Sequence, residues 1–326
     1  MSDNDTYRTQ GPMNHLATYS PTLPAEAAVR LQAWAVAAKA ALAGNTQRAY
    51  ATDSRAFADW CRSQGLATLP ATPDDVVTFL NDQAIAGKAV ATVRRRAATI
   101  SRMHKAAGLP NPCEHELVRL TLKGIAKAKG TDQKQAAALT ERDTVTIRAR
   151  MGDSIKEARD LALMLAGRDL LGRASELVAL NVTDIEADEH GAVIKMRRRK
   201  TSTETHAYYI GPEAAEALRA WLTRAAITEG SVFQSLTKGG KATGRPLDTR
   251  DVRRILKDMA VAGRLEHGAQ VSGHSLRVGM AQDLVAADMD VASVMQAGGW
   301  TTPRMVARYT EKLTARRGAV ARFYAR

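Results

Sequence analysis

Two pairs of residues in the second half of the sequence place a cationic side chain three residues from a titratable partner. Arg173 is followed by Glu176, and His274 by Arg277. One turn of helix brings residues at this spacing to the same face. Farther along, Trp300 and Tyr309 are nine residues apart. These residues are candidates for a single site that combines guanidinium groups, an imidazole and a phenol.

Such a set of side chains is suited to breaking a phosphodiester. Without a metal, the reaction needs a nucleophile, cationic donors on the nonbridging oxygens and an acid for the leaving oxygen. Arginine can bind a phosphate through two N–H groups, and Glu176 can hold such a guanidinium in place. His274 begins a predicted helix, whose N-terminal end favours an anion. Each pair alone also fits a surface ion pair or a helix cap, so the chemistry rests on the combination.

The order and spacing of these residues resemble the tyrosine recombinase, or phage integrase, family. The residues that carry the resemblance are Arg173, His274-Ser275-Leu276-Arg277, Trp300 and Tyr309. It extends over residues 45–310, because the segment 45–50 is similar to the start of the family's core-binding domain. Most integrases have histidine at the position of Trp300. Tryptophan there, together with Glu176, is more similar to the Cre-type simple recombinases.

The resemblance implies a role for each residue of the motif. Tyr309 is the nucleophile that leaves a 3′-phosphotyrosine and a free 5′-hydroxyl, and His274 is the nearest acceptor for its proton. Arg173 and Arg277 stabilise the pentacoordinate phosphorus. Trp300 can donate its indole N–H but cannot exchange a proton, which argues against it as an acid. Three other tyrosines compete for the role of nucleophile but lack the surrounding Trp300 and Pro303: Tyr208, Tyr209 and Tyr324.

Lys200 is the candidate for the general acid. It lies in a basic turn between two predicted strands and matches the mobile hairpin lysine of the family. Lys195 is close by in the sequence and remains an alternative. A run of cations is also typical of a solvated turn that contacts DNA. The expected catalytic residues are Arg173, Glu176, Lys200, His274, Arg277, Trp300 and Tyr309.

The elements that must position these residues are mostly helices. Apolar residues recur at helical spacing, and Gly or Pro separates the runs. This pattern predicts helices near 24–43, 46–65, 73–87, 89–107 and 114–129, then near 141–150, 155–171, 212–227, 248–262, 275–287, 291–297 and 303–309. The spacing of apolar residues changes from the helical period to that of a strand at 192–196 and 207–210, which predicts two short strands.

These patterns predict two domains. We expect a disordered polar tail over 1–23, a helical domain over 24–130, a linker over 131–138 and a catalytic domain over 139–326. The tail has no cationic segment followed by an apolar run, so it does not resemble a signal peptide. The expected fold is mainly α: a SAM-like, core-binding N-terminal bundle and a mixed α+β catalytic domain with a small antiparallel sheet. The resemblance implies that the two domains close as a C-shaped clamp around duplex DNA.

The charge of the chain indicates a polyanionic partner. The formal net charge is +13, with 16 Lys and Arg against 10 Asp and Glu in residues 1–130 and 31 against 24 in the remainder. Both halves therefore carry an excess of positive charge, which favours two regions that contact one long anion over a basic tail. A merely soluble basic surface is the alternative. The expected DNA-binding residues are Arg94, Arg95, Arg96, Arg102, Lys105, Arg197, Arg198 and Arg199.

Other classes of protein fit the sequence poorly. Cys61 and Cys113 are the only cysteines and fall in separate predicted helices, so a disulfide framework is not expected. Cys113 and His115 have no second ligand pair at zinc spacing, and we expect no metal or other cofactor. The longest apolar stretch, 31–43, is too short for a membrane span. A cytoplasmic, nucleoid-associated protein encoded by a bacterium, phage or plasmid is expected, without a membrane partner.

The resemblance implies a site-specific recombinase that acts in DNA integration, excision or resolution. Four protomers would assemble on two double-stranded DNA sites, each with inverted repeats, and exchange strands through a Holliday junction. A type IB topoisomerase would share the chemistry but act alone. A DNA-binding regulator would lack part of the motif, and an enzyme that forms hairpin telomeres would carry further domains.

The C-terminal segment after Tyr309 has a small apolar face if it is helical. The face contains Ala319, Val320 and Phe323. One interpretation is that it folds back onto its own domain. The resemblance favours the other, in which the terminal helix docks into a neighbouring protomer and links four subunits in a ring.

Overall fold

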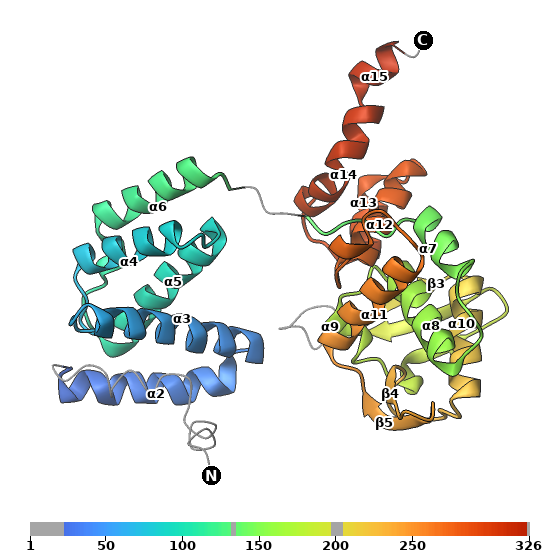
Figure 1. The fold of residues 1–326 in the computed structure, drawn as a ribbon, viewed down its shortest axis with the longest axis horizontal. Coiled ribbons are helices and arrows are strands. Elements are labelled where there is room, and N and C mark those ends of the chain that lie inside the picture. Colours follow the sequence, from blue (N-terminus) through green and yellow to red (C-terminus); the bar gives the residue numbers. More distant parts are fainter. Residues whose placement is uncertain (1–22, 132–134, 197–204, 325–326) are drawn as a thin grey trace. The chain divides into compact units, whose positions relative to one another are not determined.

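The computed structural model describes residues 23–131, 135–196 and 205–324. The chain divides into two compact units between residues 133 and 134, within the stretch expected as a linker (Figure 1). In the described residues, no helix is long and apolar enough to cross a membrane. The expected tail falls outside the described residues except for Leu23.

The first unit is a bundle of helices. Its elements are α2 (Ala25–Ala41), α3 (Gly44–Ser63), α4 (Pro73–Ile85), α5 (Val90–Ala107), the 3-10 helix η2 (Pro112–Glu114) and α6 (Glu116–Lys129). The five predicted helices of this half are confirmed, with bounds within two residues of the expected ones. Thr72 and Asp75 form a capping box that starts α4, and Gly108 ends α5 in the left-handed conformation.

The core of the first unit is aromatic and apolar. Phe57 of α3 and Phe79 of α4 are fully buried, with ring centroids 5.0 Å apart. His104 is also buried: its Nε2 accepts from the N–H of Ala71, and Nδ1 lies 2.9 Å from the carbonyl oxygen of Ile100. Burial lowers the pKa of His104, so the ring stays neutral and donates through Nδ1. This histidine is a structural residue of the bundle.

The second unit is mainly helical, with two small antiparallel sheets. Its helices are α7 (Glu141–Arg148), α8 (Ile155–Asp169), α9 (Ala174–Leu177), η3 (Val182–Asp184), α10 (Pro212–Arg224), α11 (Thr249–Ala262), η4 (Gly268–Gln270), α12 (Ser275–Ala286), α13 (Val291–Gly298), α14 (Arg304–Arg317) and α15 (Ala319–Tyr324). The strands are β1 (Ile185–Ala187), β2 (Ala192–Met196), β3 (His206–Ile210), β4 (Gln234–Leu236) and β5 (Ala242–Pro246). The order β1-β2-β3 forms one sheet, and β4-β5 forms the other.

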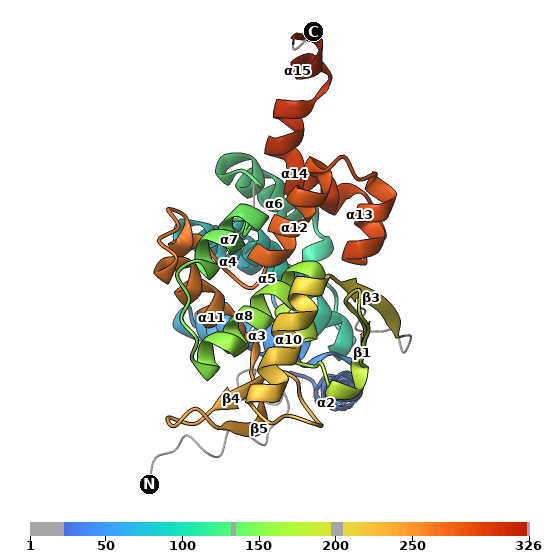
Figure 2. The same cartoon turned by 90° about the vertical axis from the view of Figure 1, so that its right-hand side faces the viewer.

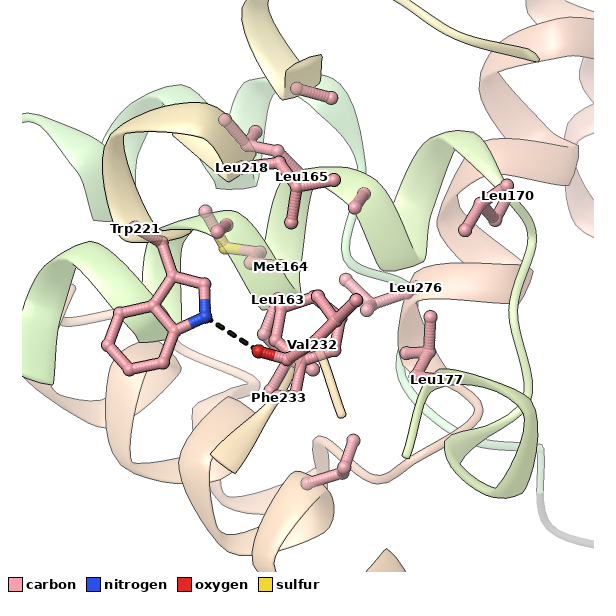
Figure 3. Packing of buried hydrophobic residues seen from close by; sticks show 14 of the residues in the cluster. Leu163, Met164, Leu165, Leu170, Leu177, Leu218, Trp221, Val232, Phe233 and Leu276 are labelled. Carbon is pink, nitrogen blue, oxygen red and sulfur yellow. Dashed lines mark hydrogen bonds between the residues drawn. The ribbon is translucent and has the colours of Figure 1, made fainter. Parts of the chain in front are cut away.

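The core of the second unit supports the helices that carry the candidate site. Trp221 of α10 is buried, and its indole N–H donates to the carbonyl oxygen of Val232 at 2.8 Å (Figure 3). Leu177 and Leu276 belong to the same buried cluster. Each is the direct neighbour of a predicted site residue, Glu176 and Arg277 respectively. The hydrophobic effect that buries the leucines therefore also fixes the end of α9 and the start of α12.

Several features of the second unit were not predicted from periodicity, among them α9, β1 and the second sheet. Strand β4 has only three residues, and Gly244 interrupts β5, so neither shows a clear alternation. The last helical region is longer than the predicted 303–309, because α14 extends to Arg317 and α15 follows. Figures 1 and 2 show the end of α14 and α15 projecting away from the rest of the second unit.

Candidate active site

The first part of the site is the turn that leads from α8 into α9. Leu171 is buried in the left-handed conformation, with φ of 44°, which is uncommon for a residue other than glycine. Gly172 follows, where an added Cβ would lie 2.8 Å from a methyl carbon of Leu177. At the start of α9, the Glu176 carboxylate accepts from both the main-chain N–H and the guanidinium of Arg173. Glu176 is buried, so it holds a partly exposed arginine by both its main chain and its side chain.

The second part is α12, which carries Arg277 into the interior. The Arg277 side chain is only 1% exposed. Its guanidinium donates to the carbonyl oxygens of Leu171 and Gly298, both at 2.5 Å. These acceptors use two of the five N–H groups of an arginine. Two turns that are far apart in the sequence are therefore joined through one buried cation.

Trp300 and Tyr309 lie against this cation. The guanidinium carbon of Arg277 is 4.5 Å from the centre of the Trp300 ring, and the Trp300 and Tyr309 rings meet edge to face at 5.7 Å. Gly298 makes room for the indole, since an added Cβ would lie 2.3 Å from it. Pro303 is the N-cap residue of α14. The structure thus brings Arg277, Trp300 and Tyr309 together.

His274 is the N-cap residue of α12, and its side chain is open to solvent. Partial burial lowers the pKa of this histidine below its ordinary 6.5, and the charges of Arg277 and Arg173 lower it further. Arg253 of α11 acts in the same direction, while Glu176 opposes them. The imidazole is therefore neutral near pH 7 and able to accept a proton.

Lys200 and the cations Arg197, Arg198 and Arg199 lie outside the described residues. Lys195, the alternative acid, is on β2 and forms an ion pair with Glu186 of β1. The stem of the hairpin ends where Met196 pairs with His206. Beside it is a cavity of about 270 Å³ between β3 and α13, lined by His206, Ala207, Tyr208, Met295, Gln296, Gly299 and Trp300.

The other tyrosines occupy different surroundings. Tyr208 and Tyr209 are on β3, and the hydroxyl of Tyr209 donates to the carbonyl oxygen of His190 at 2.6 Å. Tyr324 is at the exposed end of α15. Of the tyrosines in the described part of the chain, Tyr309 is the one whose ring contacts Trp300. The same part of the chain contains no group of three or more His, Cys, Asp or Glu placed to hold a metal ion.

Comparisons with known proteins cover both units. The phage integrase family matches residues 137–316, and the SAM-like N-terminal domain of phage integrases matches residues 34–108. The chain belongs to the phage integrase family, whose members are tyrosine recombinases. It is 34% identical to an integrase/recombinase xerD homolog of Selenomonas ruminantium, over 83% of this chain and 82% of that protein. It is 29% identical to the Cre recombinase of Escherichia phage P1, over 82% and 84% of the two chains.

Solved structures have the same fold as this recombinase. One is the XerH site-specific recombinase bound to a palindromic difH substrate, with a TM-score of 0.61, 15% identity and coverage of 86% and 80%. Another is a lambda integrase dimer bound to a COC′ core site, with a TM-score of 0.61, 17% identity and coverage of 86% and 94%. These likenesses confirm the predicted fold class of the recombinase, a SAM-like helical domain followed by a mainly helical catalytic domain.

The cations predicted to bind DNA on α5 of the recombinase fall into two groups. Arg95 and Arg96 form ion pairs with Asp53, a buried acid of α3, at 2.9 and 3.7 Å. Lys105 pairs with Glu114 at 2.7 Å. Three of the five predicted DNA-binding cations of α5 are therefore paired with acids that come from other elements.

Arg94 and Arg102 form the second group. Both are exposed, and no acid partner of either is found in the described part of the recombinase. Helical spacing places them on one face, with the small residue Ala98 exposed between them. This face is the part of α5 that is open to a phosphate backbone.

Several groups around the site were missed by sequence reasoning. The carbonyl oxygens of Leu171 and Gly298 bind Arg277 but belong to the main chain, so no side chain marks them. The adjacent glycines at 172 and 299 were the available signal, because they indicate tight turns. Arg253 of α11 was also missed, since it is more than twenty residues from His274 and only the packing of the recombinase brings its charge near.

Proposed function

We propose that this recombinase cleaves and rejoins double-stranded DNA at specific sites through a 3′-phosphotyrosine on Tyr309. The observation that carries the proposal is the contact series from Arg277 through Trp300 to Tyr309, with Arg173 and a neutral His274 nearby. In this series the phenol of Tyr309 contacts the Trp300 ring, which in turn lies against the Arg277 guanidinium. Membership of the family and the likeness to the Cre recombinase support the same chemistry.

In the proposed reaction, the Tyr309 oxygen forms a bond to phosphorus and the bond from phosphorus to the 5′-oxygen breaks. His274 accepts the phenolic proton, and its lowered pKa suits that role. Arg173 and Arg277 stabilise the charge of the pentacoordinate phosphorus, while the Trp300 N–H donates to a nonbridging oxygen. We assign to Lys200 the proton that the 5′-oxygen takes up. A free 5′-hydroxyl, of the same or another strand, then attacks the phosphotyrosine and reverses these steps.

Glu176 has a positioning role in this proposal. Its carboxylate holds Arg173 by two bonds while itself being buried. An arginine held in this way loses less conformational entropy when it binds a phosphate. The charge stabilisation comes from arginines, so the proposal needs no metal ion or ATP.

Both units would contact the DNA. The open face of α5, with Arg94 and Arg102, is the candidate surface of the first unit. Arg197, Arg198 and Arg199 are candidates in the second, and the two units would close around the duplex as a clamp. A site with inverted repeats would seat two protomers, and two such sites would assemble a tetramer that exchanges strands through a Holliday junction. This activity implies a cytoplasmic, nucleoid-associated protein.

A direct test uses the full-length recombinase and a nicked suicide substrate taken from the DNA that flanks its gene. We expect an adduct that resists SDS and still forms in EDTA. Loss of the adduct in EDTA that magnesium alone restores would contradict the metal-free reaction. Recombination between two sites, rather than relaxation of any supercoiled plasmid, distinguishes the proposal from a type IB topoisomerase.

We also propose that α15 joins neighbouring protomers. Val320, Phe323 and Tyr324 are 72, 67 and 80% exposed, so the apolar face does not fold back onto its own unit. Figures 1 and 2 show the end of α14 and α15 extending away from that unit. A neighbouring copy of the chain is the partner that the family resemblance indicates for such an arm.

Deletion of residues 314–326 is expected to prevent synapsis and recombination while it leaves binding of a single arm nearly unchanged. Burial of a Val and a Phe side chain contributes roughly 1.5–3 kcal/mol each, so a protein contact loses far more than DNA binding does. Analytical ultracentrifugation with a full two-arm site gives the state of assembly. Val261→Ala, at an exposed valine of α11, is the matched control. A truncated chain that still forms a tetramer and recombines would show that α15 does not link protomers.

A further inference from the structure

Residues 135–141, which we call the strap, follow the connection between the two units and lie along α12. The N–H of Leu139 donates to the carbonyl oxygen of Ser275 at 3.0 Å. The N–H of Glu141 donates to Asp283 at 2.8 Å. Between these two points, an added Cβ on Gly279 would lie 1.8 Å from the carbonyl oxygen of Leu139. The strap therefore contacts three successive turns of the helix that carries Arg277.

The other end of the strap reaches the main chain of the nucleophile. The side-chain amide of Gln135 donates to the carbonyl oxygen of Tyr309 at 3.4 Å. The side-chain amide of Gln282, on α12, donates to the same oxygen at 2.9 Å. Two amide groups, one from the strap and one from α12, thus meet at a single carbonyl of α14.

These two donors are not needed to satisfy that carbonyl. Tyr309 is in the middle of α14, eight residues before its end, whereas the carbonyls without a partner in a helix are those of the last turn. A side chain that donates to a mid-helix carbonyl pulls the carbonyl outward and sets the local direction of the helix. The effect of Gln135 and Gln282 is therefore on the position of the Tyr309 turn.

The neighbouring residues of α14 restrain the same turn from the buried side. Val306 and Thr310 are 3 and 2% exposed, and the Thr310 hydroxyl donates to the Val306 carbonyl at 2.9 Å. Apolar packing of this kind resists displacement toward the core but gives little direction along the surface. The glutamine amides supply directional restraints at the residue whose hydroxyl must meet the phosphate.

We propose that Gln282 and Gln135 are positioning residues for the nucleophile, and that the strap couples α12 to α14. The proposal rests on the assignment of Tyr309 as the nucleophile. Displacement of a reacting group by about 1 Å can cost roughly 100-fold in rate, so a partial loss of restraint has a measurable effect. The strap is the first described segment of the catalytic unit.

The test compares substitutions that change the donor: Met and Glu keep the length of the glutamine side chain, and Lys is one atom longer. Gln282→Met removes the donor, Gln282→Glu replaces it with an acceptor, and Gln282→Lys restores a donor. We measure single-turnover formation of the covalent adduct at saturating DNA, together with DNA affinity and the midpoint of thermal unfolding. We expect the Lys variant to be the fastest of the three, the Met variant to react about 10-fold more slowly than wild type, and the Glu variant to be the slowest. The affinity for DNA and the midpoint of thermal unfolding are expected to stay unchanged in all three variants.

Combination with Gln135→Met sharpens the test. Each glutamine partly compensates for the other because they share one acceptor, so the double Met variant should fall by more than the product of the single effects. Gln32→Met, at an exposed glutamine of α2, is the matched control and is expected to match wild type. Equal rates for all three substitutions at 282, or a rate loss that follows a lower unfolding midpoint, would overturn the positioning role.

A second readout does not depend on activity. Amide hydrogen exchange of α14 in the free protein should become faster around residues 309–313 in the double Met variant, and the Gln32 control should leave it unchanged. Unchanged hydrogen exchange in the double variant would refute the proposal that the strap restrains α14. If wild type forms no adduct with DNA, the proposed function fails, whereas the exchange result still decides whether the strap restrains α14.

Discussion

Replacement of Tyr309 by phenylalanine is expected to abolish covalent attachment to DNA and leave affinity for the same duplex within about threefold. Only the nucleophilic oxygen is lost, because the ring that contacts Trp300 is retained. In the described part of the chain, the Tyr309 hydroxyl has no hydrogen-bond partner. Its removal therefore leaves no buried donor or acceptor unpaired and should change stability little. The measurement is SDS-resistant adduct formed with a nicked suicide substrate.

Tyr209→Phe is the matched control for that experiment. It removes a phenolic hydroxyl from the same unit, and the hydroxyl it removes donates to the carbonyl oxygen of His190. We expect normal adduct formation from this variant. An adduct that persists in the Tyr309 variant would show that another residue is the nucleophile, and its mapping by mass spectrometry would identify that residue.

Lys200→Ala is expected to slow cleavage by roughly 100-fold or more on an ordinary substrate, the typical contribution of a general acid. On a substrate whose 5′-bridging oxygen is replaced by sulfur, the loss should be much smaller. A thiolate is a good leaving group and needs little protonation, so the acid has little to contribute there. The ratio of the two cleavage rates thus isolates the protonation of the leaving group from DNA binding.

Lys195→Ala provides the comparison, because this lysine is on the same hairpin and pairs with Glu186. We expect it to cleave both substrates nearly as wild type does. Equal impairment of Lys200→Ala on both substrates would remove Lys200 from the acid role, with His274 as the next candidate. A Lys195 variant with the selective defect would identify Lys195 as the acid instead.

The burial of Arg277 bears on how the site is prepared for catalysis. A buried guanidinium is costly unless its N–H groups are paired, and here two carbonyl oxygens and an aromatic face surround it. The turns at Leu171 and Gly298 are thereby held in place in the protein alone. Groups that are already oriented need not reorganise when charge develops on a phosphate, which favours the reaction.

Much of this recombinase could be predicted from its sequence. The helical period, broken by Gly and Pro, predicted each α-helix in the described part of the first unit within two residues. The spacing of Arg173 and Glu176 predicted that they would lie together, and the structure joins them. Such predictions succeed because a helix brings residues three or four positions apart to one face, whatever surrounds it. The order of Arg173, His274, Arg277, Trp300 and Tyr309 also sufficed to indicate the family.

Other features were decided by the tertiary structure alone. Arg95, Arg96 and Lys105 form ion pairs with Asp53 and Glu114, which approach them from other elements. The two carbonyl oxygens that hold Arg277 are 106 and 21 residues away from it along the chain. Gln135 is separated from the Tyr309 carbonyl by 174 residues. No local period encodes contacts over such distances, because they depend on how buried leucines such as Leu177 and Leu276 pack one helix against another. The sequence by itself therefore determined which side chains the recombinase has for its chemistry, and the packing of the core decided which groups hold them in place.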